Sequence, residues 1–326
     1  MSLFRPRTVD PETRRPRAWP ARFRRQRLLI VGCGDVGARV VRQAVPRRGV
    51  QLLALSSQPQ RLAALRTQGL AVLSGNLDQP HSLRRLAGWA HRVLHLAPPG
   101  ADAGALDLRT RTLVQALRRG RQPLQLAYGS TSGVYGNRHG ALLRETDIVA
   151  PATDRARRRV HAEQTLRRWG RQGLGQPAIS ILRIPGIYAP DRPQGTPRER
   201  LLRGTPALQP QDDSYSNHIH ADDLARACWL ALWRGRPQRI VHVNDDARLK
   251  MGDYFDLAAD LYGLPRPPRI SLAAAREQLS PMLLSFMQES RQLDNRRLKQ
   301  ELGLVLRYPT PEQGLLPRQP LQSASC

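Results

Sequence analysis

Short apolar runs alternate with longer amphipathic segments over the first half of this chain. The runs that predict strands are residues 28–31, 52–55, 71–73, 93–96, 124–128 and 178–182. The segments with helical periodicity are residues 36–45, 82–89, 105–119 and 154–169. Buried runs separated by helices are typical of a parallel sheet that is covered on both faces. Right-handed crossovers then predict a doubly wound α/β fold.

The alternation stops near residue 183, where prolines become frequent and indicate loops and turns. We therefore expect a large α/β domain over residues 27–183 and a small α/β lobe made mainly from residues 184–316. One further apolar run, residues 239–243, predicts a strand that returns to the sheet. Residues 1–26 are rich in arginine and proline and predict a disordered basic tail, and residues 317–326 a second tail.

The charge is extreme, with 52 Lys and Arg against 26 Asp and Glu and a net charge of +26. Such a chain attracts nucleic acid without specificity at low salt, so a nucleic-acid-binding protein is one hypothesis. Aromatic residues, however, do not alternate with the basic ones as they do in single-strand binders. We expect most arginines to lie on solvated helix faces, and no specific nucleic-acid partner.

The cysteines and the hydropathy indicate a compartment. Cys33, Cys228 and Cys326 form no C-x-x-C pair and no zinc spacing, which favours a reducing, cytoplasmic location. No apolar run approaches the ~20 residues of a membrane span. Residues 1–26 lack the apolar core of a secretory signal.

A glycine-rich loop follows the first predicted strand directly. It reads Gly32-Cys33-Gly34-Asp35-Val36-Gly37 and opens a predicted helix. In this strand–loop–helix context the spacing is typical of dinucleotide binding, with Gly32 allowing the tight turn, Gly34 the approach of a pyrophosphate and Gly37 close packing of the helix. The helix N-terminus adds unpaired N–H groups that favour a phosphate.

The end of the second predicted strand indicates which dinucleotide binds. An acidic residue there would bind the ribose 2′-hydroxyl of NAD. This chain instead has Ser56 and Ser57, followed by Arg61. Hydroxyls and an arginine suit a 2′-phosphate, so NADP is favoured over NAD; an ordinary helix start with an exposed arginine is the alternative.

Together with four later stretches, this loop resembles the extended short-chain dehydrogenase/reductase superfamily, the NAD(P)-dependent epimerase/dehydratase group, and most closely its YeeZ-type branch. The resemblance covers about residues 27–316, and its stretches are 75–78, 95–99, 130–136, 182–188 and 217–225. It implies a Rossmann fold. It also implies further cofactor contacts, at Asn76, Leu77, Ala97, Pro98, Pro99, Pro185 and Ile187. This family is often dimeric, which makes a homodimer an expectation.

The resemblance also places the catalytic residues, and here the chain departs from the family. Thr131 matches the family's Ser or Thr, four residues before Tyr135. With Glu163 fixing the register, Arg155 stands where the family has tyrosine and Arg159 where it has lysine. Arg159 can still hold the cofactor ribose and carry the lysine's charge.

Arg155 cannot replace the tyrosine as a proton donor, because a guanidinium stays protonated. It could polarise a carbonyl electrostatically, or the two arginines could simply form a solvated face paired with Glu163. Among substitute donors we favour Tyr135 over Thr131 and Tyr188, with structural packing of Tyr135 as the alternative.

For the substrate we expect contacts from Thr131, Arg183, Tyr188 and His218. Arginines near the lobe, namely Arg183, Arg198, Arg200 and Arg203, favour an anionic small molecule. His218 and His220 share a strand face, but no third ligand has a clear spacing, so we expect no metal.

Two functions remain open on the sequence alone. The first is an NAD(P)-dependent oxidoreductase or epimerase with an atypical site. The second is a non-catalytic NADP-binding sensor, which the missing tyrosine at position 155 motivates.

Overall fold

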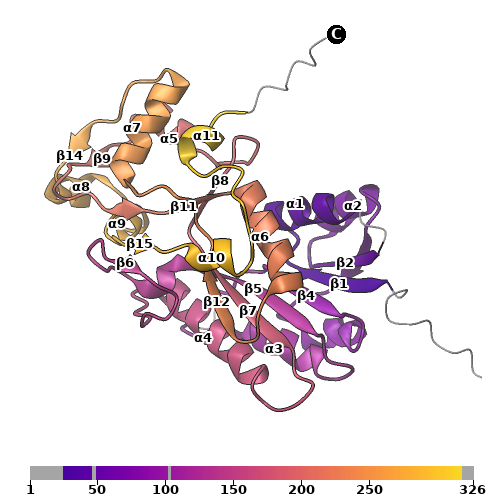
Figure 1. Ribbon diagram of the computed structural model, residues 1–326. Helices are drawn as coiled ribbons and strands as arrows, with labels where there is room; N and C mark the ends of the chain where they lie inside the picture. The colour runs from indigo at the N-terminus through magenta and orange to yellow at the C-terminus, as the bar shows by residue number, and fades with distance from the viewer. Residues whose placement is uncertain (1–24, 46–48, 102–103, 318–326) are drawn as a thin grey trace, which may run out of the picture.

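A parallel sheet of seven strands forms the centre of the molecule, in the order β12-β7-β5-β4-β1-β2-β3. The computed structural model describes residues 25–45, 49–101 and 104–317 (Figure 1). The strands of the sheet are β1 (Gln26–Val31), β2 (Val50–Ser56), β3 (Ala71–Ser74), β4 (Arg92–His95), β5 (Gln125–Thr131), β7 (Ala178–Ile184) and β12 (Arg239–His242). The order reverses between β1 and β4, and a ligand crevice is expected at that point, beyond the carboxyl ends of the strands.

Helices cover both faces of the sheet, because alternate residues of each strand point to opposite sides. Leu28 and Ile30 pack on α1 (Asp35–Ala44) and α6 (Ala221–Arg234). Leu29 and Val31 pack on the opposite layer, which contains the 3₁₀ helix η3 (Pro80–Leu86), α3 (Leu108–Leu117) and α4 (Asp154–Trp169). The helix α2 (Pro59–Thr67) joins β2 to β3. The expected doubly wound fold is thus confirmed.

One helix prediction differs in detail, and one helix start is set by a histidine. The segment expected as a helix over residues 82–89 is the 3₁₀ helix η3, which begins at Pro80, a residue that has no N–H to donate. Helix α6 begins at Ala221, and the ring of His220 caps it by accepting a hydrogen bond from the N–H of Asp222.

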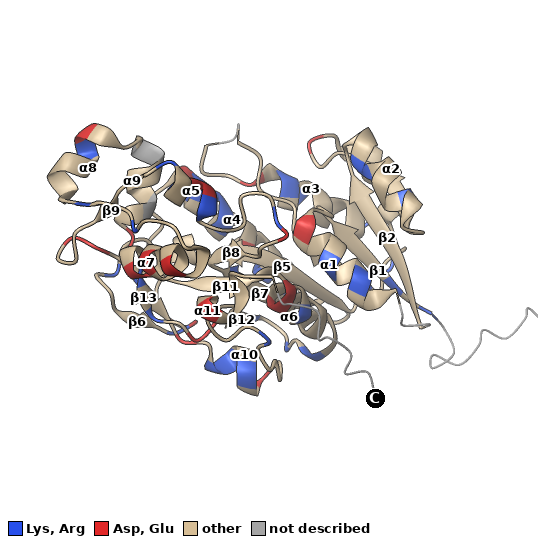
Figure 2. Cartoon of the chain, turned by 90° about the horizontal axis from the view of Figure 1, so that it is seen from above, with Lys and Arg blue, Asp and Glu red and all other residues tan. Residues whose placement is uncertain are grey.

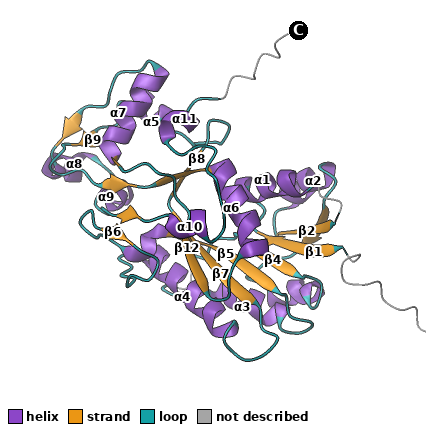
Figure 3. Cartoon of the chain, in the orientation of Figure 1, coloured by secondary structure: helices purple, strands orange, loops and turns teal. Residues whose placement is uncertain are grey.

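The remaining elements lie mostly beyond the carboxyl edge of the sheet, where they form a smaller lobe (Figure 3). Its helices are α5 (Arg198–Leu202), α7 (Met251–Tyr262), α8 (Leu272–Gln278), α9 (Pro281–Met287) and α11 (Pro311–Gly314). Its short strands pair as β8 (Gly186–Tyr188) with β11 (His218–His220), β9 (Ala207–Leu208) with β14 (Arg269–Ile270), and β10 (Tyr215–Ser216) with β13 (Leu249–Lys250). The chain crosses between lobe and sheet more than once: α6 and β12 return to the sheet, as predicted for residues 239–243.

A pair of short strands joins two distant segments of the chain. The strands β6 (Leu142–Leu143) and β15 (Gln292–Leu293) pair in parallel although about 150 residues separate them. In the chain, β6 comes after η4 (Ser132–Tyr135), and β15 comes before α10 (Arg296–Gln300). This pairing brings the segment around residue 290 to the end of β5.

Lys and Arg residues are distributed over most of the described helices, including α1, α2, α3 and α10, as the colouring of Figure 2 shows. No described helix is long and apolar enough to cross a membrane.

Candidate active site

The glycine loop has the geometry that its sequence predicts. Gly32 has a φ of +81°, and a Cβ there would come within 2.4 Å of the backbone nitrogen of Ala97. A Cβ on Gly37 would lie 3.2 Å from the Sγ of Cys33, so the glycine lets α1 pack close to the loop. Gly34 is the N-cap of α1, and no side chain caps this helix, so its first N–H groups remain available to a ligand.

One half of a cleft lies beside this loop, over β1, β2 and β3, with a volume of about 380 Å³. The predicted cofactor residues that line it are Gly32, Gly34, Ser56, Ser57, Arg61, Asn76, Leu77, Ala97 and Pro98. The Nη1 of Arg61 donates to the carbonyl of Cys33 at 3.3 Å. Arg61 and the two serines line the same end of the cleft.

The other half of the cleft, about 310 Å³, extends along α1 to the ends of β5 and β7. Its lining includes the remaining predicted cofactor residues Asp35, Val36, Gly37, Arg159, Pro185 and Ile187, together with Thr131. The two halves share Gly32, Gly34 and Leu96. Pro99 lies outside the cleft and lines the larger cavity described below.

Arg39, which the sequence analysis did not single out, joins the segments around this half of the cleft. Arg39 is buried, and it donates to Asp191 at 2.6 Å, to Asp222 at 2.5 Å and to Asp35 at 3.2 Å. Burial alone would lower the pKa of Arg39, but the hydrogen bonds that it donates to these three carboxylates raise it. Arg39 thus ties the glycine loop to α6 and to the loop before α5. Arg192 also reaches the cleft and lies 3.8 Å from a carboxylate oxygen of Asp35.

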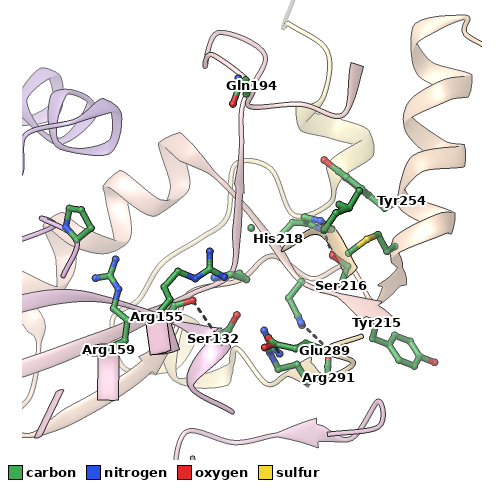
Figure 4. A pocket seen from close by; sticks show the side chains of 18 of the residues that line it. Ser132, Arg155, Arg159, Gln194, Tyr215, Ser216, His218, Tyr254, Glu289 and Arg291 are labelled. Carbon is green, nitrogen blue, oxygen red and sulfur yellow. Dashed lines mark hydrogen bonds and ion pairs between the residues drawn. The ribbon is translucent and has the colours of Figure 1, made fainter. Parts of the chain in front are cut away.

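A larger cavity, about 820 Å³, lies between the sheet and the lobe. It shares Thr131, Arg159 and Pro185 with the cleft, so a ligand in the cavity would meet the end of a ligand in the cleft. Figure 4 shows Arg155, Arg159 and Ser132 on one side of it, and His218, Ser216 and Tyr254 on the other.

The helix face predicted for the catalytic pair does point to the cavity. Arg155, Arg158 and Arg159 of α4 all line it. Arg159 donates to the carbonyl of Gly129 at 2.6 Å and to the hydroxyl of Tyr128 at 3.1 Å, which anchors its guanidinium at the end of β5. Thr131 accepts a hydrogen bond from the N–H of Gly133, which leaves its own hydroxyl hydrogen for a ligand.

Arg183, predicted to contact the substrate, lies away from the described cavities. Both its side chain and that of Glu163 are almost fully buried, and the pair is joined at 2.7 Å. Ser130 donates to the same carboxylate at 2.6 Å. Glu163 therefore pairs with Arg183 rather than with the arginines of its own helix, and the network holds α4 against β5 and β7. The predicted contact of Arg183 with a substrate does not fit this buried position.

Tyr135 and Tyr188, the two tyrosines predicted as substitute proton donors, do not fit that role. Tyr135 is fully buried; its hydroxyl accepts from Arg183 at 2.6 Å and lies 2.6 Å from the Nε2 of His242. Burial raises the pKa of Tyr135 to about 12, against the opposing effect of Arg183. The hydroxyl of Tyr188 donates to the carbonyl of Thr310. Tyr135 lines none of the described cavities and packs structurally, whereas Tyr188 lines a smaller cavity of about 380 Å³ in the lobe and not the one at Thr131.

His218 and His220 have separate roles. His218 lines the cavity and stacks on Tyr254, with ring centroids 4.0 Å apart, and burial lowers its pKa to about 4. His220 faces α6, which it caps, and stacks on Tyr308. No group of three His, Cys, Asp or Glu side chains that could hold a metal occurs among the described residues.

One acidic residue at the cavity had no signal in the sequence. Glu289 precedes β15, its side chain is 16% exposed, and Arg291 donates to its Oε2 at 2.8 Å. This oxygen lies 3.9 Å from where a Cβ on Gly133 would be, beside the end of β5 (Figure 4). Among the described residues that line this cavity, Glu289 is the one carboxylate. Only the long-range pairing of β6 with β15 brings it there.

Comparison with known proteins agrees with this geometry. The sequence profile of the family described as NAD dependent epimerase/dehydratase matches residues 28–244. A functionally unknown conserved protein from Silicibacter pomeroyi is 29% identical, with a TM-score of 0.72 over 89% of this chain and 96% of that one. UDP-glucose 4-epimerase from Thermotoga maritima, solved with UDP-glucose, is 17% identical, with a TM-score of 0.70 over 89% and 96% of the two chains. UDP-glucuronic acid 4-epimerase from Bacillus cereus, solved with NAD, is 15% identical, with a TM-score of 0.69 over 89% and 96%. No curated protein matches the chain.

Proposed function

Because this chain belongs to the NAD dependent epimerase/dehydratase family, we propose that it binds NADP in the cleft and exchanges a hydride with a small molecule in the adjacent cavity. The observation that carries this proposal is the junction of the two spaces at Thr131, Arg159 and Pro185. A bound nicotinamide cofactor supplies the hydride acceptor or donor. The chain must then orient the substrate and move one proton.

The residues of the cleft fit such a cofactor. A Cβ on Gly34 would lie 3.3 Å from the Nη1 of Arg61, so only a residue without a side chain leaves the floor of the cleft open at this point. The uncapped N-terminus of α1 favours a phosphate group. Ser56, Ser57 and Arg61 would hold a ribose 2′-phosphate, which supports NADP over NAD.

We assign the proton transfer to Glu289 rather than to the missing tyrosine. Its carboxylate would accept the proton of a substrate hydroxyl when the carbon that bears this hydroxyl is oxidised to a carbonyl. In the reverse direction it would return the proton to the carbonyl oxygen. Thr131 would hold the same oxygen by a hydrogen bond. The arrangement suits Glu289 because carboxylates give and take protons, whereas the neighbouring arginines stay charged.

The two arginines on the helix have different parts in this proposal. Arg159, fixed on Gly129 and Tyr128, supplies the positive charge beside the cofactor that a lysine supplies in the family. Arg155 faces the cavity where the family has its tyrosine, and it would stabilise negative charge that develops on the substrate oxygen. The assignment of the chain to the YeeZ-type branch, and a cytoplasmic location, remain part of the proposal.

The test is turnover. Purified protein with NADP or NADPH is offered a panel of hydroxy and carbonyl compounds, sugar nucleotides included, with absorbance at 340 nm and product analysis by proton NMR as readouts. We expect turnover that disappears in Gly34→Ala. Tight NADPH binding with no turnover on any compound would instead favour the sensor, the alternative that Arg155 at the tyrosine position supports.

A further inference from the structure

All strands of the central sheet begin at one edge, because they pair in parallel, and this amino edge lies opposite the cofactor cleft. Six connections lead from a helix end into the next strand there, namely residues 45–49, 68–70, 87–91, 118–124, 170–177 and 235–238. None of the six contains Asp or Glu, although the chain holds 26 such residues. The amino edge is therefore a region whose connections supply no negative side chain.

Three of these connections lie side by side, because they lead into the neighbouring strands β4, β5 and β7. The N–H of Leu124 donates to the carbonyl of His91 at 2.8 Å, and the N–H of Ala178 donates to the carbonyl of Leu124 at 3.0 Å. Exposed arginines occupy these connections and the helix turns that precede them: Arg84, Arg85, Arg118, Arg121, Arg168 and Arg171. We call these six residues the amino-edge patch.

The arginines of the amino-edge patch lack acidic partners. None of the six forms an ion pair with a residue that the structure describes. In the lobe, by contrast, Arg266, Arg269 and Arg296 each pair with an aspartate. Burial, and then repulsion from Arg171, lower the pKa of the half-buried Arg167, so cations crowd at this edge. Arginine is abundant throughout the chain, but the missing acids are particular to the amino edge.

The helix dipole explains only part of this charge. A cation in the last turn of a helix is stabilised by the partial negative charge at that end, and Arg85 and Arg168 occupy such turns. Arg121 and Arg171, however, lie in the connections after α3 and α4 have ended, and the effect of the dipole falls off within the last turn. Stabilisation of helix ends also gives no reason for six connections without an acid.

The arrangement of the amino-edge patch fits an extended polyanion better than a small anion. Its six side chains are spread over three connections, and none of them lines a cavity described above. A guanidinium binds phosphate oxygens through paired N–H donors. Several guanidinium groups spread along one edge can each bind a different phosphate of a nucleic-acid backbone.

The other side chains of the three connections favour contacts to phosphates alone. Trp89 is half-buried, and these connections contain no exposed aromatic ring that could stack on a base. Leu124 and Leu174 are exposed. The helices α3 and α4, however, meet this edge with their ends, so neither lays an apolar face along it as the helices of membrane-surface proteins do. A nucleic-acid backbone therefore fits the patch better than a lipid bilayer.

We propose that the amino-edge patch binds the phosphate backbone of nucleic acid without sequence preference. The bound strand lies at the edge of the sheet opposite the cofactor cleft, and the six arginines make the contacts. The inference does not depend on the proposed function. It is compatible with the expectation that the chain has no sequence-specific nucleic-acid partner.

The test measures how binding depends on salt, because each phosphate that a protein neutralises releases a counterion. Fluorescence anisotropy follows the full-length protein with a labelled DNA duplex, a second duplex of different sequence and an RNA duplex, at about 50–200 mM sodium chloride. The patch variant combines Arg118→Gln, Arg121→Gln and Arg171→Gln. We expect its slope of log K against log salt to be less steep by about two to three units, and its affinity to fall at least about 10-fold.

The lobe variant is the matched control, because it loses the same charge far from the patch. It combines Arg198→Gln, Arg248→Gln and Arg276→Gln, which are exposed in the wild type. Its slope should change by less than about one unit and its affinity by less than about threefold. Thermal melts verify that both variants fold, and an NADPH titration of the same samples reports separately on the cofactor cleft.

Three results would overturn the inference. Equal losses in the two variants would show that net charge alone attracts the nucleic acid. Absence of binding at the lowest salt concentration, or a strong preference for one of the two DNA sequences, would exclude backbone contacts of this kind. Tighter binding to vesicles of phosphatidylserine and phosphatidylcholine than to either nucleic acid, lost in the patch variant, would make the patch a membrane-binding surface instead.

Discussion

The cofactor cleft and the substrate cavity of this protein are assembled in opposite ways. The cleft takes most of its lining from residues 31–109, where each strand end is followed within a few residues by the side chains that face the ligand. The cavity is lined by short segments from α4, β8, β10 and α7 and by Glu289 and Arg291, so its walls come from positions as far apart as 155 and 291. The residues of the cleft follow closely after strand ends, so they can be predicted from the sequence. The residues of the cavity meet only through the packing of distant segments, so they cannot.

The same difference explains which predictions succeeded. The glycine loop and the serines after β2 lie in the cleft as expected, since the turn and the strand end dictate their direction. Tyr135 and Arg183 lie in the stretches 130–136 and 182–188 that resemble the family's site, but they point into the protein, where they bond to each other. A motif fixes a residue's place along a strand, but not whether a partner from another segment, here Glu163 or His242, already occupies its polar atoms.

Glu289 marks the limit of sequence reasoning. Nothing near it resembles a catalytic motif, and its place beside Gly133 follows from the pairing of β15 with β6. Arg39 is similar, because two of its three acids come from the loop before α5 and from α6. Such groups become visible only when the three-dimensional contacts are known.

The largest expected effect concerns the cavity. Glu289→Gln removes the proton acceptor but keeps the shape of the side chain. We expect kcat to fall by a factor of about 10²–10⁴, the usual cost of losing a positioned acid–base group, with NADPH affinity unchanged. The measurement is steady-state turnover on a substrate found in the screen. Glu277→Gln, an exposed change on α8, is the matched control; equal activity in the two variants would remove Glu289 from the mechanism.

The next effect concerns the cleft. Gly34→Ala places a methyl group where a pyrophosphate is expected, and the only side-chain atom near it belongs to the flexible Arg61. NADPH affinity should fall about 100-fold, about 2.7 kcal/mol, while the melting temperature stays close to that of the wild type. Gly69→Ala has open space around the new methyl and tests backbone strain alone. The account of the loop fails if Gly34→Ala binds NADPH normally.

A smaller effect separates NADP from NAD. Arg61→Ala removes the guanidinium that we assign to the 2′-phosphate, and the preference for NADPH over NADH should fall about 10-fold, in line with a charge-assisted hydrogen bond. Fluorescence titration with both cofactors measures it. Arg66→Ala, an exposed change on the same helix, should leave the preference intact. If the wild type prefers NADH from the outset, the assignment of NADP is wrong.

The last effect concerns stability rather than ligand binding, and it involves two buried histidines: His95 at the end of β4 and His218 in the wall of the cavity. Burial lowers the pKa of His95 to about 3 and that of His218 to about 4, below the ordinary 6.5. Between these values and 6.5 the unfolded chain binds more protons than the folded one. Stability is therefore fully present above pH 6.5 and is lost as the pH falls, by up to about 1.4 kcal/mol per pH unit for each histidine.

Urea unfolding at pH 7.0, 6.0 and 5.0 measures this dependence. The slope should be smaller in His95→Gln than in the wild type. A free energy of unfolding that does not change between pH 7.0 and 5.0 would show that these rings are not buried as neutral groups.

The central claim is that the cleft holds a nicotinamide dinucleotide whose reactive end meets the cavity at Thr131 and Arg159. The most direct measurement is a fluorescence titration of the purified protein with NADPH, repeated with NADH, NADP and NAD. The account predicts saturable binding with one cofactor per chain and the highest affinity for the phosphorylated forms. Absence of saturable binding with all four nucleotides would contradict it.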